Sequence, residues 1–342
     1  MTADAGTPGT FEVIKPGLST TVQDLGRPGW YHLGIPVSGA MDRFALRVAN
    51  LLVGNDDGDA ALEAVFLGPE LRFASDAVVA VTGADLPPRV DGQPVPAWTS
   101  VRVRAGQTLS FEFLRTGARA YVAIAGGIDV PVVLGSRSTY PLGALGGLEG
   151  RALRTGDVLA VGPPHASDVG ATVPPALRRA PESCLRVMAG LYWDRLTIDA
   201  QRTFFADAWK VAPEADRIGY RFRGGRALGF VPRTPPFGAG SDPSNIVDSC
   251  YPYGSIQVPG GVEPIILHRD AVSGGGYCTI GAVISADMDL IAQMQPHASI
   301  RFELVGMDEA LAARRGSAGL LERVRTHLTV AGSADATGRP EG

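Results

Sequence analysis

Lysine is nearly absent from this 342-residue sequence: of 31 basic residues, only Lys15 and Lys210 are lysines. A P-loop needs a lysine directly after its glycine turn, and a biotin or lipoyl carrier needs one at an exposed hairpin tip. Neither the Glu-Val-Ile-Lys15-Pro context nor the Ala-Trp-Lys210-Val context meets these requirements. The sequence therefore predicts that any phosphate loop or covalent tether belongs to another chain.

Cysteine is also scarce, with Cys184, Cys250 and Cys278 and no C-x-x-C pair. This count argues against a disulfide framework and a zinc site, so we expect reduced thiols and no metal. The N-terminus has neither a basic start nor an apolar core, and no apolar run approaches the ~18 residues of a membrane helix. We therefore expect a cytoplasmic protein without a membrane partner.

Charge is low as well, because charged residues make up 19% of the chain and the formal net charge is −4. Such a balance gives no electrostatic attraction to nucleic acid. The sequence contains no Gly-x-Ser-x-Gly elbow, no dinucleotide glycine fingerprint and no HExxH motif. Serine-hydrolase, dinucleotide-binding and zinc-protease chemistry thus lose their usual sequence support.

Glycine and proline are abundant, with 44 and 26 residues, and 45% of residues are hydrophobic. Short alternating or β-branched runs between turn signals predict a mainly β protein with closed or nearly closed barrels. The expected strands are 77–82, 101–104, 109–113, 121–124, 185–188, 254–258, 265–268 and 300–304.

Few helices are expected. Apolar spacing predicts one over 39–53 capped by Ser38, one between Ser285 and Pro296, and one over 308–325. Residues 1–9 and 328–342 are small and polar and predict frayed ends. The expected organisation is a first module over 10–165, a proline-rich linker over 166–182, a second module over 183–312, and a helix end with a tail over 313–342.

The glycine run Ser273-Gly-Gly-Gly-Tyr-Cys278 is the first candidate for chemistry. If it forms a loop, Gly274, Gly275 and Gly276 allow backbone N–H groups to converge on an anion or a carbonyl oxygen. Tyr277 adds a hydroxyl group and an aromatic ring. The alternative interpretation is a simple flexible turn.

The segment from Thr20 to Asp42 contains a second group of polar residues between glycines, including Asp24 and Arg27. Binding residues concentrate in such loops. Arg137 follows an apolar strand directly and is able to clamp a carboxylate or a phosphate. It equally suits pairing with a neighbouring acid.

An ordered set of motifs lies between about residues 11 and 310. The motifs are TTVQDLGRPG, GIPVSGAMD, ANLLVGN, GPELRF, VTGAD, RAYVAIAGGIDVPVVLGSRST, GGLEGRALRTGDVL, ADRIGYRFRG, GSIQVPGGVEPIIL and GGYCTIGAVISADMDLIAQMQP. With these motifs the chain resembles the biotin-dependent carboxyltransferase subunit family, which is also called allophanate hydrolase subunit 2 or the C-type subunit of 5-oxoprolinase and is related to urea amidolyase.

The resemblance implies two cyclophilin-like β-barrel modules and a B-type partner subunit in a hetero-oligomer. It implies a carboxyltransferase or an ATP-dependent amide hydrolase, of 5-oxoprolinase or urea-amidolyase type, that acts on a lactam, urea or an allophanate-like amide and is inactive without partners. ATP or carboxybiotin would come through partner subunits, with an A-type subunit or a biotin carrier protein as further partners. The alternative is a non-catalytic regulatory subunit that antagonises a kinase-inhibitor partner.

Site residues are interpreted within this resemblance. We expect Gln257, Asp270 and Tyr277 to be the catalytic residues that orient the substrate in the second module. Substrate-binding residues are expected to be Asp24, Arg27 and Arg137 in the first module, and Gly274, Gly275 and Gly276 in the second.

Two departures from the family pattern bear on the substrate. The family commonly has Asp-x-Gln-Thr-Thr-Gly-Gly-Tyr-Pro where this chain has Asp-Ala-Val-Ser-Gly-Gly-Gly-Tyr-Cys over 270–278. It commonly has Ser-Glu-Gly where this chain has Asp-Ser-Cys over 248–250. Both changes replace polar residues in the second module, which favours a different small amide or ketone substrate.

Overall fold

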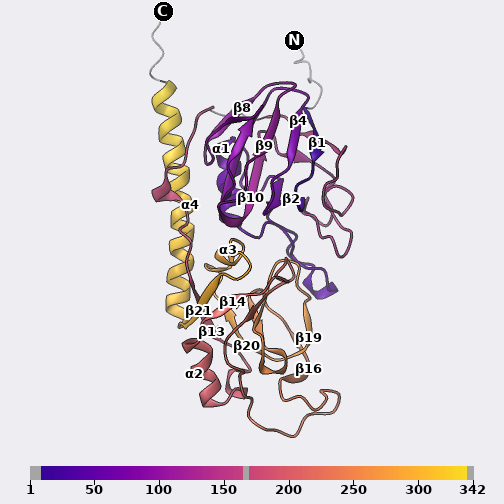
Figure 1. Ribbon diagram of the computed structural model, residues 1–342, viewed down its shortest axis with the longest axis vertical. Coiled ribbons are helices and arrows are strands. Elements are labelled where there is room, and N and C mark those ends of the chain that lie inside the picture. Colours follow the sequence, from indigo (N-terminus) through magenta and orange to yellow (C-terminus); the bar gives the residue numbers. More distant parts are fainter. Residues whose placement is uncertain (1–8, 165–168, 337–342) are drawn as a thin grey trace, which may run out of the picture. The chain divides into compact units, whose positions relative to one another are not determined.

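The computed structural model describes residues 9–164 and 169–336 and divides the chain into two compact units (Figure 1). Unit 1 comprises the chain through Arg27, Ser38–Arg179 and the part from Gly319 on. Unit 2 comprises Pro28–Val37 and Ala180–Ala318. The predicted ends 1–8 and 337–342, and residues 165–168 of the predicted linker, lie outside the described residues.

Unit 1 consists of two β-sheets. The seven-stranded sheet has the order β11-β12-β1-β4-β9-β6-β7, and the five-stranded sheet has the order β2-β3-β10-β5-β8. Their strands are β1 (Thr10–Lys15), β2 (Thr20–Gln23), β3 (Ala61–Val65), β4 (Glu70–Phe73), β5 (Ala77–Asp85), β6 (Pro88–Val90), β7 (Gln93–Pro94), β8 (Ser100–Val103), β9 (Thr108–Phe111), β10 (Thr116–Ile124), β11 (Ile128–Asp129) and β12 (Val158–Val161).

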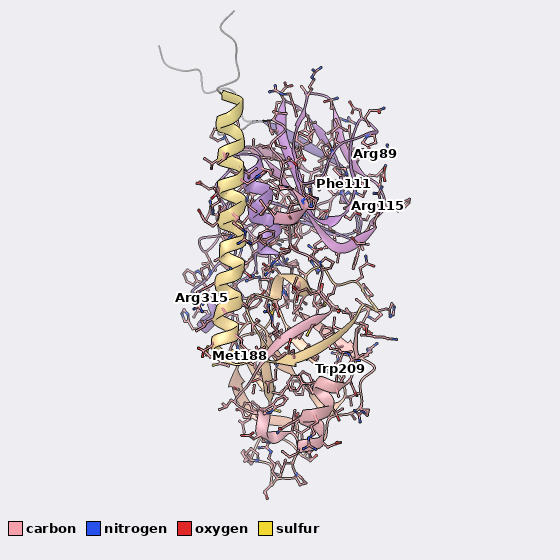
Figure 2. The ribbon with its side chains drawn as sticks, turned by 90° about the vertical axis from the view of Figure 1, so that its left-hand side faces the viewer. Arg89, Phe111, Arg115, Met188, Trp209 and Arg315 are labelled. Carbon is pink, nitrogen blue, oxygen red and sulfur yellow. The ribbon has the colours of Figure 1, made fainter. Side chains whose placement is uncertain are left out.

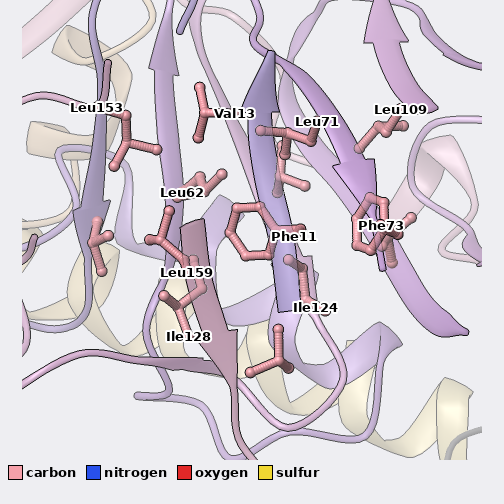
Figure 3. Close-up of a cluster of buried hydrophobic side chains, with 14 of the residues drawn as sticks. Phe11, Val13, Leu62, Leu71, Phe73, Leu109, Ile124, Ile128, Leu153 and Leu159 are labelled. Atoms are coloured by element: carbon pink, nitrogen blue, oxygen red, sulfur yellow. The ribbon is translucent and has the colours of Figure 1, made fainter. Parts of the chain in front are cut away.

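The core of unit 1 lies between these sheets, where residues from both faces form one cluster (Figure 3). Phe11 and Phe73 from neighbouring strands contact each other with ring centroids 5.8 Å apart, and Leu62 and Ile124 come from the other sheet. Alternate residues of β10 point to opposite faces, so Ile124 enters this core while Tyr121 faces the helix layer. Both faces of the five-stranded sheet are therefore covered.

Helix α1 (Arg43–Leu52) and the later turns of α4 (Met307–Ala336) cover the outer face of the five-stranded sheet. The predicted helix over 39–53 is real but begins later, and Ser38 does not cap it. Asp42 does, because its Oδ1 accepts the Ala45 N–H at 2.9 Å, whereas Ser38 has a φ of 54°. The aspartate stands one residue before the first helical turn, where an N-cap must be.

The prediction of a frayed end from residue 328 is wrong for the described residues, because helix α4 continues through Ala336. Leu321 and Val324 of this helix are buried in unit 1. Part of the predicted linker is likewise attached to unit 1. Val173 is fully buried and donates its N–H to Trp98 O at 2.9 Å, while the Ala171 carbonyl accepts from Ser100 N at 2.8 Å.

Unit 2 contains a closed seven-stranded barrel with the order β13-β20-β17-β18-β15-β14-β21, in which β13 and β21 are parallel. In β13 the buried Leu185 and Val187 alternate with less buried residues, because successive side chains point to opposite faces. The strands are β13 (Cys184–Ala189), β14 (Trp209–Val211), β15 (Gly219–Arg223), β17 (Ser255–Gln257), β18 (Ile265–Leu267), β20 (Thr279–Val283) and β21 (Ser299–Leu304). The prediction of a mainly β fold is therefore confirmed, with the closed barrel in unit 2.

Helix α2 (Ile198–Ala206) packs on this barrel and is a helix that the sequence analysis did not predict. Its Phe204 stacks on Phe302 with centroids 4.5 Å apart, and the Phe204 carbonyl accepts the indole N–H of the fully buried Trp209 at 3.0 Å. Trp209 is labelled in Figure 2. The short α3 (Met288–Ile291) lies where a helix after Ser285 is predicted. Among the described residues no helix combines the length and apolarity of a membrane span.

A separate two-stranded ribbon of unit 2 is made by β16 (Asn245–Cys250) and β19 (Gly274–Tyr277), which are antiparallel. Cα pairing joins Ser249 to Gly275 and Asn245 to Tyr277. The glycine-rich run therefore lies in a β-ribbon, next to the barrel strand β20 that follows it in the chain.

Candidate functional site

Asp24 in unit 1 organises the loop that carries Arg137. Its carboxylate accepts hydrogen bonds from Gly26 N at 2.7 Å, Ser136 Oγ at 2.7 Å, Arg137 N at 2.6 Å and Ser138 Oγ. The side chain is buried, and donors of the chain itself surround its oxygens. In the structure Asp24 therefore shapes a loop, and its predicted contact with a substrate stays a prediction.

Arg27 is fully buried beside the same loop. Its Nη2 donates to Ser138 O and its Nε to Val133 O at 3.5 Å. Gly146 lies against it with φ at +65°, and a Cβ there would come within 2.6 Å of Arg27 Nη2 and 2.1 Å of Ser138 O. Glycine is required at this close approach, and Arg27 is part of the interior of unit 1.

Arg137 is the member of this trio that borders open space. Its side chain is 39% exposed, with Nε donating to Val130 O at 2.9 Å and Nη2 lying 3.2 Å from Asp129 Oδ1. It lines a pocket of about 180 Å³ together with Asp59 and Gly126. The structure thus brings Asp24, Arg27 and Arg137 together at one loop, with the last facing a small polar pocket.

A buried network that the sequence analysis did not single out lies under the start of α1. Glu63 Oε2 accepts from Tyr121 Oη at 2.7 Å and from Met41 N at 2.8 Å, and Asp42 N donates to Tyr121 Oη at 2.8 Å. Arg119 Nε lies 3.8 Å from Glu63 Oε1, with both side chains buried. Burial, followed by the nearby carboxylate charges, raises the pKa of Tyr121 well above its usual value. The sequence signal that could have revealed this network is the presence of a Glu, an Arg and a Tyr within otherwise apolar strands.

Asp270 in unit 2 forms a buried ion pair. Arg217 Nε lies 2.7 Å from its Oδ2 and Nη2 lies 3.3 Å from its Oδ1, and the Asp270 N–H donates to Arg217 O at 2.9 Å. A bidentate guanidinium fixes the plane of the carboxylate. Asp270 therefore anchors the chain where β18 ends, and its predicted catalytic role is untested.

The predicted glycine loop is wrong in its geometry. Gly274, Gly275 and Gly276 are extended residues of β19 without positive φ, so their N–H groups alternate in direction instead of converging. Glycine is needed for another reason. A Cβ on Gly275 would lie 3.1 Å from the Tyr251 ring, and one on Gly274 would lie 2.9 Å from the Ser249 carbonyl.

Tyr251 packs across this glycine strand and was not predicted. Its hydroxyl accepts from Tyr277 N at 2.7 Å and donates to Tyr277 O at 3.0 Å, so one side chain satisfies two backbone groups. Tyr31 Oη lies 3.2 Å from Tyr251 O and 3.3 Å from Val272 O. Burial raises the pKa values of both Tyr251 and Tyr31. No sequence spacing links Tyr31 to this ribbon, because the contact exists only in the fold.

Gln257 lies on β17 with Cα pairing to Ile265 and Thr279. The residue is 6% exposed, and its side-chain amide has no hydrogen-bond partner among the described residues. Neither amide atom is among the fully enclosed atoms that lack a partner, so the amide is reached by solvent and is able to bond to a water or a ligand. Gln257 pairs with the first residue of β18, whereas Asp270 comes after the last residue of β18. The structure therefore places the two predicted catalytic residues at opposite ends of the β17–β18 pair.

Tyr277 lies two residues before Thr279 and therefore near the end of β17 that carries Gln257. It is 44% exposed and its hydroxyl has no hydrogen-bond partner in the described chain. The arrangement thus offers an amide and a phenol at one end of the barrel. No group of three His, Cys, Asp or Glu side chains within 9–164 and 169–336 is placed to hold a metal ion.

Comparison with known proteins agrees with this fold. The chain is 36% identical to the C-type subunit of 5-oxoprolinase from Escherichia coli, over 93% of this chain and 98% of that protein. It is also 36% identical to urea amidolyase of Saccharomyces cerevisiae, where it spans only 16% of the relative's length.

A crystal structure of the K. lactis urea amidolyase matches with a TM-score of 0.86 and 33% identity, covering 94% of this chain and 20% of that one. The Kluyveromyces lactis urea carboxylase matches with the same TM-score at 32% identity, covering 94% and 30%. Residues 33–304 match the family described as "Carboxyltransferase domain, subdomain A and B". The resemblance carried by the sequence motifs is confirmed, and the chain belongs to this carboxyltransferase family.

Proposed function

We propose that this chain is the carboxyltransferase subunit of a multi-subunit enzyme that activates and opens a small amide. The single observation that carries the proposal is the match to the C-type subunit of 5-oxoprolinase over 93% of this chain and 98% of that protein. A chain that matches a named subunit along nearly its full length is expected to work with partners. We expect a B-type subunit, with an A-type subunit or a biotin carrier protein as further components.

The two lysines support an external source of ATP or carboxybiotin. Lys15 ends β1 and its Nζ pairs with Glu70 at 2.7 Å, and Lys210 is the central residue of the barrel strand β14. Neither stands at a hairpin tip where a tether would swing freely. A carboxyl or phosphoryl donor would supply the activated group, while this chain binds and orients the amide.

The end of the barrel with Gln257 and Tyr277 is the place we propose for that amide. An amide resists attack because resonance stabilises it, so catalysis requires donors aimed at the oxygen where negative charge develops. The unpartnered amide of Gln257 supplies such a donor and an acceptor, and the Tyr277 hydroxyl supplies a second donor. The ion pair of Asp270 with Arg217 lies at the other end of β18 and fixes this strand, whose first residue pairs with Gln257.

The test is co-expression with a B-type subunit from the same genome, followed by assays on lactams, urea and guanidines. We expect turnover that depends on ATP or bicarbonate in the complex and none in the isolated chain. Robust ATP-dependent turnover by the isolated chain would contradict the proposal that the activity requires partner subunits. A stable complex inactive on every amide would favour the regulatory alternative.

A further inference from the structure

Two arginines of unit 2 lie outside the residues used so far. Leu196 and Phe230 form an antiparallel bridge, and Val231 N donates to Arg195 O at 2.8 Å. Arg195 therefore lies opposite Val231, two residues before Arg233. We call Arg195 and Arg233 the arginine pair.

Both members of the arginine pair bind one tight turn. Asn245 N donates to Asp242 O at 3.1 Å and closes this turn at the start of β16. Arg195 Nη2 donates to Pro243 O, and Arg233 Nη2 donates to Asn245 O. The two guanidinium groups therefore converge on carbonyls of the same four-residue segment.

Each guanidinium retains a buried donor. The Nε atoms of Arg195 and Arg233 are both inaccessible to solvent and have no hydrogen-bond partner in the described part of the chain. Leaving a buried charged donor unpaired is more costly than leaving a neutral one. Two such donors at one turn indicate a ligand that accepts hydrogen bonds.

The charges around the turn favour an anion. The turn carries one carboxylate, that of Asp242, and two guanidinium groups donate to its carbonyls. That carboxylate already accepts from Ser244 N at 2.8 Å and Ser244 Oγ at 2.7 Å. Burial, the largest influence, raises the pKa of the Cys278 thiol, so the neutral thiol supplies no compensating charge.

The turn is attached to the proposed amide site. Cys278 N donates to Ser244 O at 3.1 Å, and Gly260 N donates to Ser244 Oγ at 3.0 Å. Cys278 directly precedes Thr279, the strand partner of Gln257. The arginine pair and the unpartnered amide thus belong to the same end of the barrel.

We infer that the arginine pair binds a small planar oxyanion, either a carboxylate or bicarbonate. Each guanidinium gives Nη2 to a turn carbonyl and keeps Nε, so the pair offers an anion one charged donor from each arginine. Two positively charged donors suit the two oxygens of a planar anion better than they suit a neutral amide. The assignment of this anion to a carboxylate on the substrate or to bicarbonate rests on the proposed function. The binding site itself rests on the arginine pair and the turn alone.

The test is thermal unfolding of the full chain titrated with sodium acetate or sodium bicarbonate at one buffered pH. Acetamide, a neutral molecule of nearly the same shape as acetate, and sodium chloride at matched ionic strength are the ligand controls. We expect a saturable rise in the melting midpoint with acetate or bicarbonate and none with acetamide. An equal rise with acetamide or chloride would overturn the inference.

Arg195→Gln and Arg233→Gln retain a donor for the turn carbonyl but remove the charge. Each should weaken the apparent affinity about tenfold or more, the scale of a lost charged hydrogen bond. Arg226→Gln is the matched control, because Arg226 pairs with Asp207 elsewhere in unit 2, and it should titrate like the wild type. Unchanged affinity in both variants of the pair would overturn the site.

Arg233→Lys covers the case in which a glutamine variant does not fold. It keeps the positive charge but lacks Nε, so weaker anion binding in a folded protein supports the role of the Nε donor and unchanged binding contradicts it. Stronger response to acetate indicates a substrate carboxylate, and stronger response to bicarbonate indicates the carboxyl source. Because the assay needs neither partner nor turnover, its failure leaves the amide chemistry standing, and an inactive complex leaves anion binding standing.

Discussion

In unit 1 the buried Asp24 carboxylate accepts four hydrogen bonds from its own chain, whereas in unit 2 the buried Gln257 amide accepts and donates none among the described residues. Unit 2 also holds Arg195 and Arg233, whose buried Nε atoms have no partner in the described part of the chain. Saturated polar groups stabilise a fold, whereas an unsaturated buried group is completed by a water, an ion or a ligand or is kept at a cost in stability. Unit 1 has buried atoms of its own without a hydrogen-bond partner among the described residues, at Ser38 Oγ and Arg47 Nε, so the contrast concerns the Asp24 loop and not the whole of unit 1. It supports a structural role for that loop and is consistent with our proposal that the amide binds in unit 2.

The largest expected effect is on the structural side of this comparison. Glu63→Gln leaves the buried Arg119 without its carboxylate, and breaking a buried ion pair in this way costs about 3 kcal/mol. We expect the free energy of unfolding, measured by chemical denaturation, to fall by that amount. Glu322→Gln, at a side chain 72% exposed on α4, is the matched control and should be nearly neutral. A neutral Glu63→Gln would remove the structural assignment.

Gln257→Ala tests the chemical role that we propose for unit 2. Because the amide has no protein partner, its loss should change stability by less than about 1 kcal/mol. Turnover by the reconstituted complex should fall about tenfold or more, as for removal of a donor to a developing oxyanion. Gln93→Ala, at an exposed position of β7, is the control for both measurements. Full turnover in Gln257→Ala would end the assignment of chemistry to this residue.

The glycine strand gives a prediction of intermediate size. In Gly275→Ala the new Cβ lies 3.1 Å from the Tyr251 ring, so the ring must shift, and we expect a loss of about 1 kcal/mol in stability. Gly316→Ala on α4 meets no atom within 4 Å and should instead stabilise by about 0.5–1 kcal/mol. Thermal unfolding of both variants tests the packing explanation, which a stabilising Gly275→Ala would contradict.

The smallest effect is expected at an exposed ion pair of unit 2. Hydrogen bonds from Arg226 lower the pKa of Asp207 to about 2, from 3.8 in the unfolded chain. A carboxyl with a depressed pKa stabilises the fold above the unfolded value, and this contribution disappears as the pH falls through the folded value. Arg226→Gln should therefore lower the melting midpoint slightly at pH 7, and the difference from wild type should shrink from pH 3.8 toward about 2. A difference independent of pH would exclude this pair as its cause.

The strands illustrate how far local sequence reaches. Alternation over 300–304 and 185–188 predicts β21 and β13 to within a residue or two, because the period of two reflects one buried face. Helix α1 was predicted with the wrong cap, since Ser38 and Asp42 are both suitable residue types and only the backbone conformation distinguishes them. Helix α2 was missed because it is only nine residues long and its apolar residues, three of them consecutive at its end, give a weak helical period.

For the candidate site residues, prediction from the sequence reaches a sharper limit. Motifs identified Asp24, Arg27, Gln257 and Asp270 as members of a family pattern, but not which of them would be saturated by its own chain. That depends on partners such as Ser136 or Arg217, which lie 112 and 53 residues away along the sequence. No local pattern encodes such contacts.

Strand periodicity and residue identity are local properties, so the mainly β fold, the turn-rich connections and the lack of a P-loop lysine could be inferred without coordinates. The three-dimensional fold was needed to show that the glycine run is a strand under Tyr251, that Glu63 is a buried counter-ion, and that Arg195 and Arg233 meet over one turn. Each of these depends on which segments the sheets and the barrel bring together, and burial then sets the cost of every polar group left without a partner.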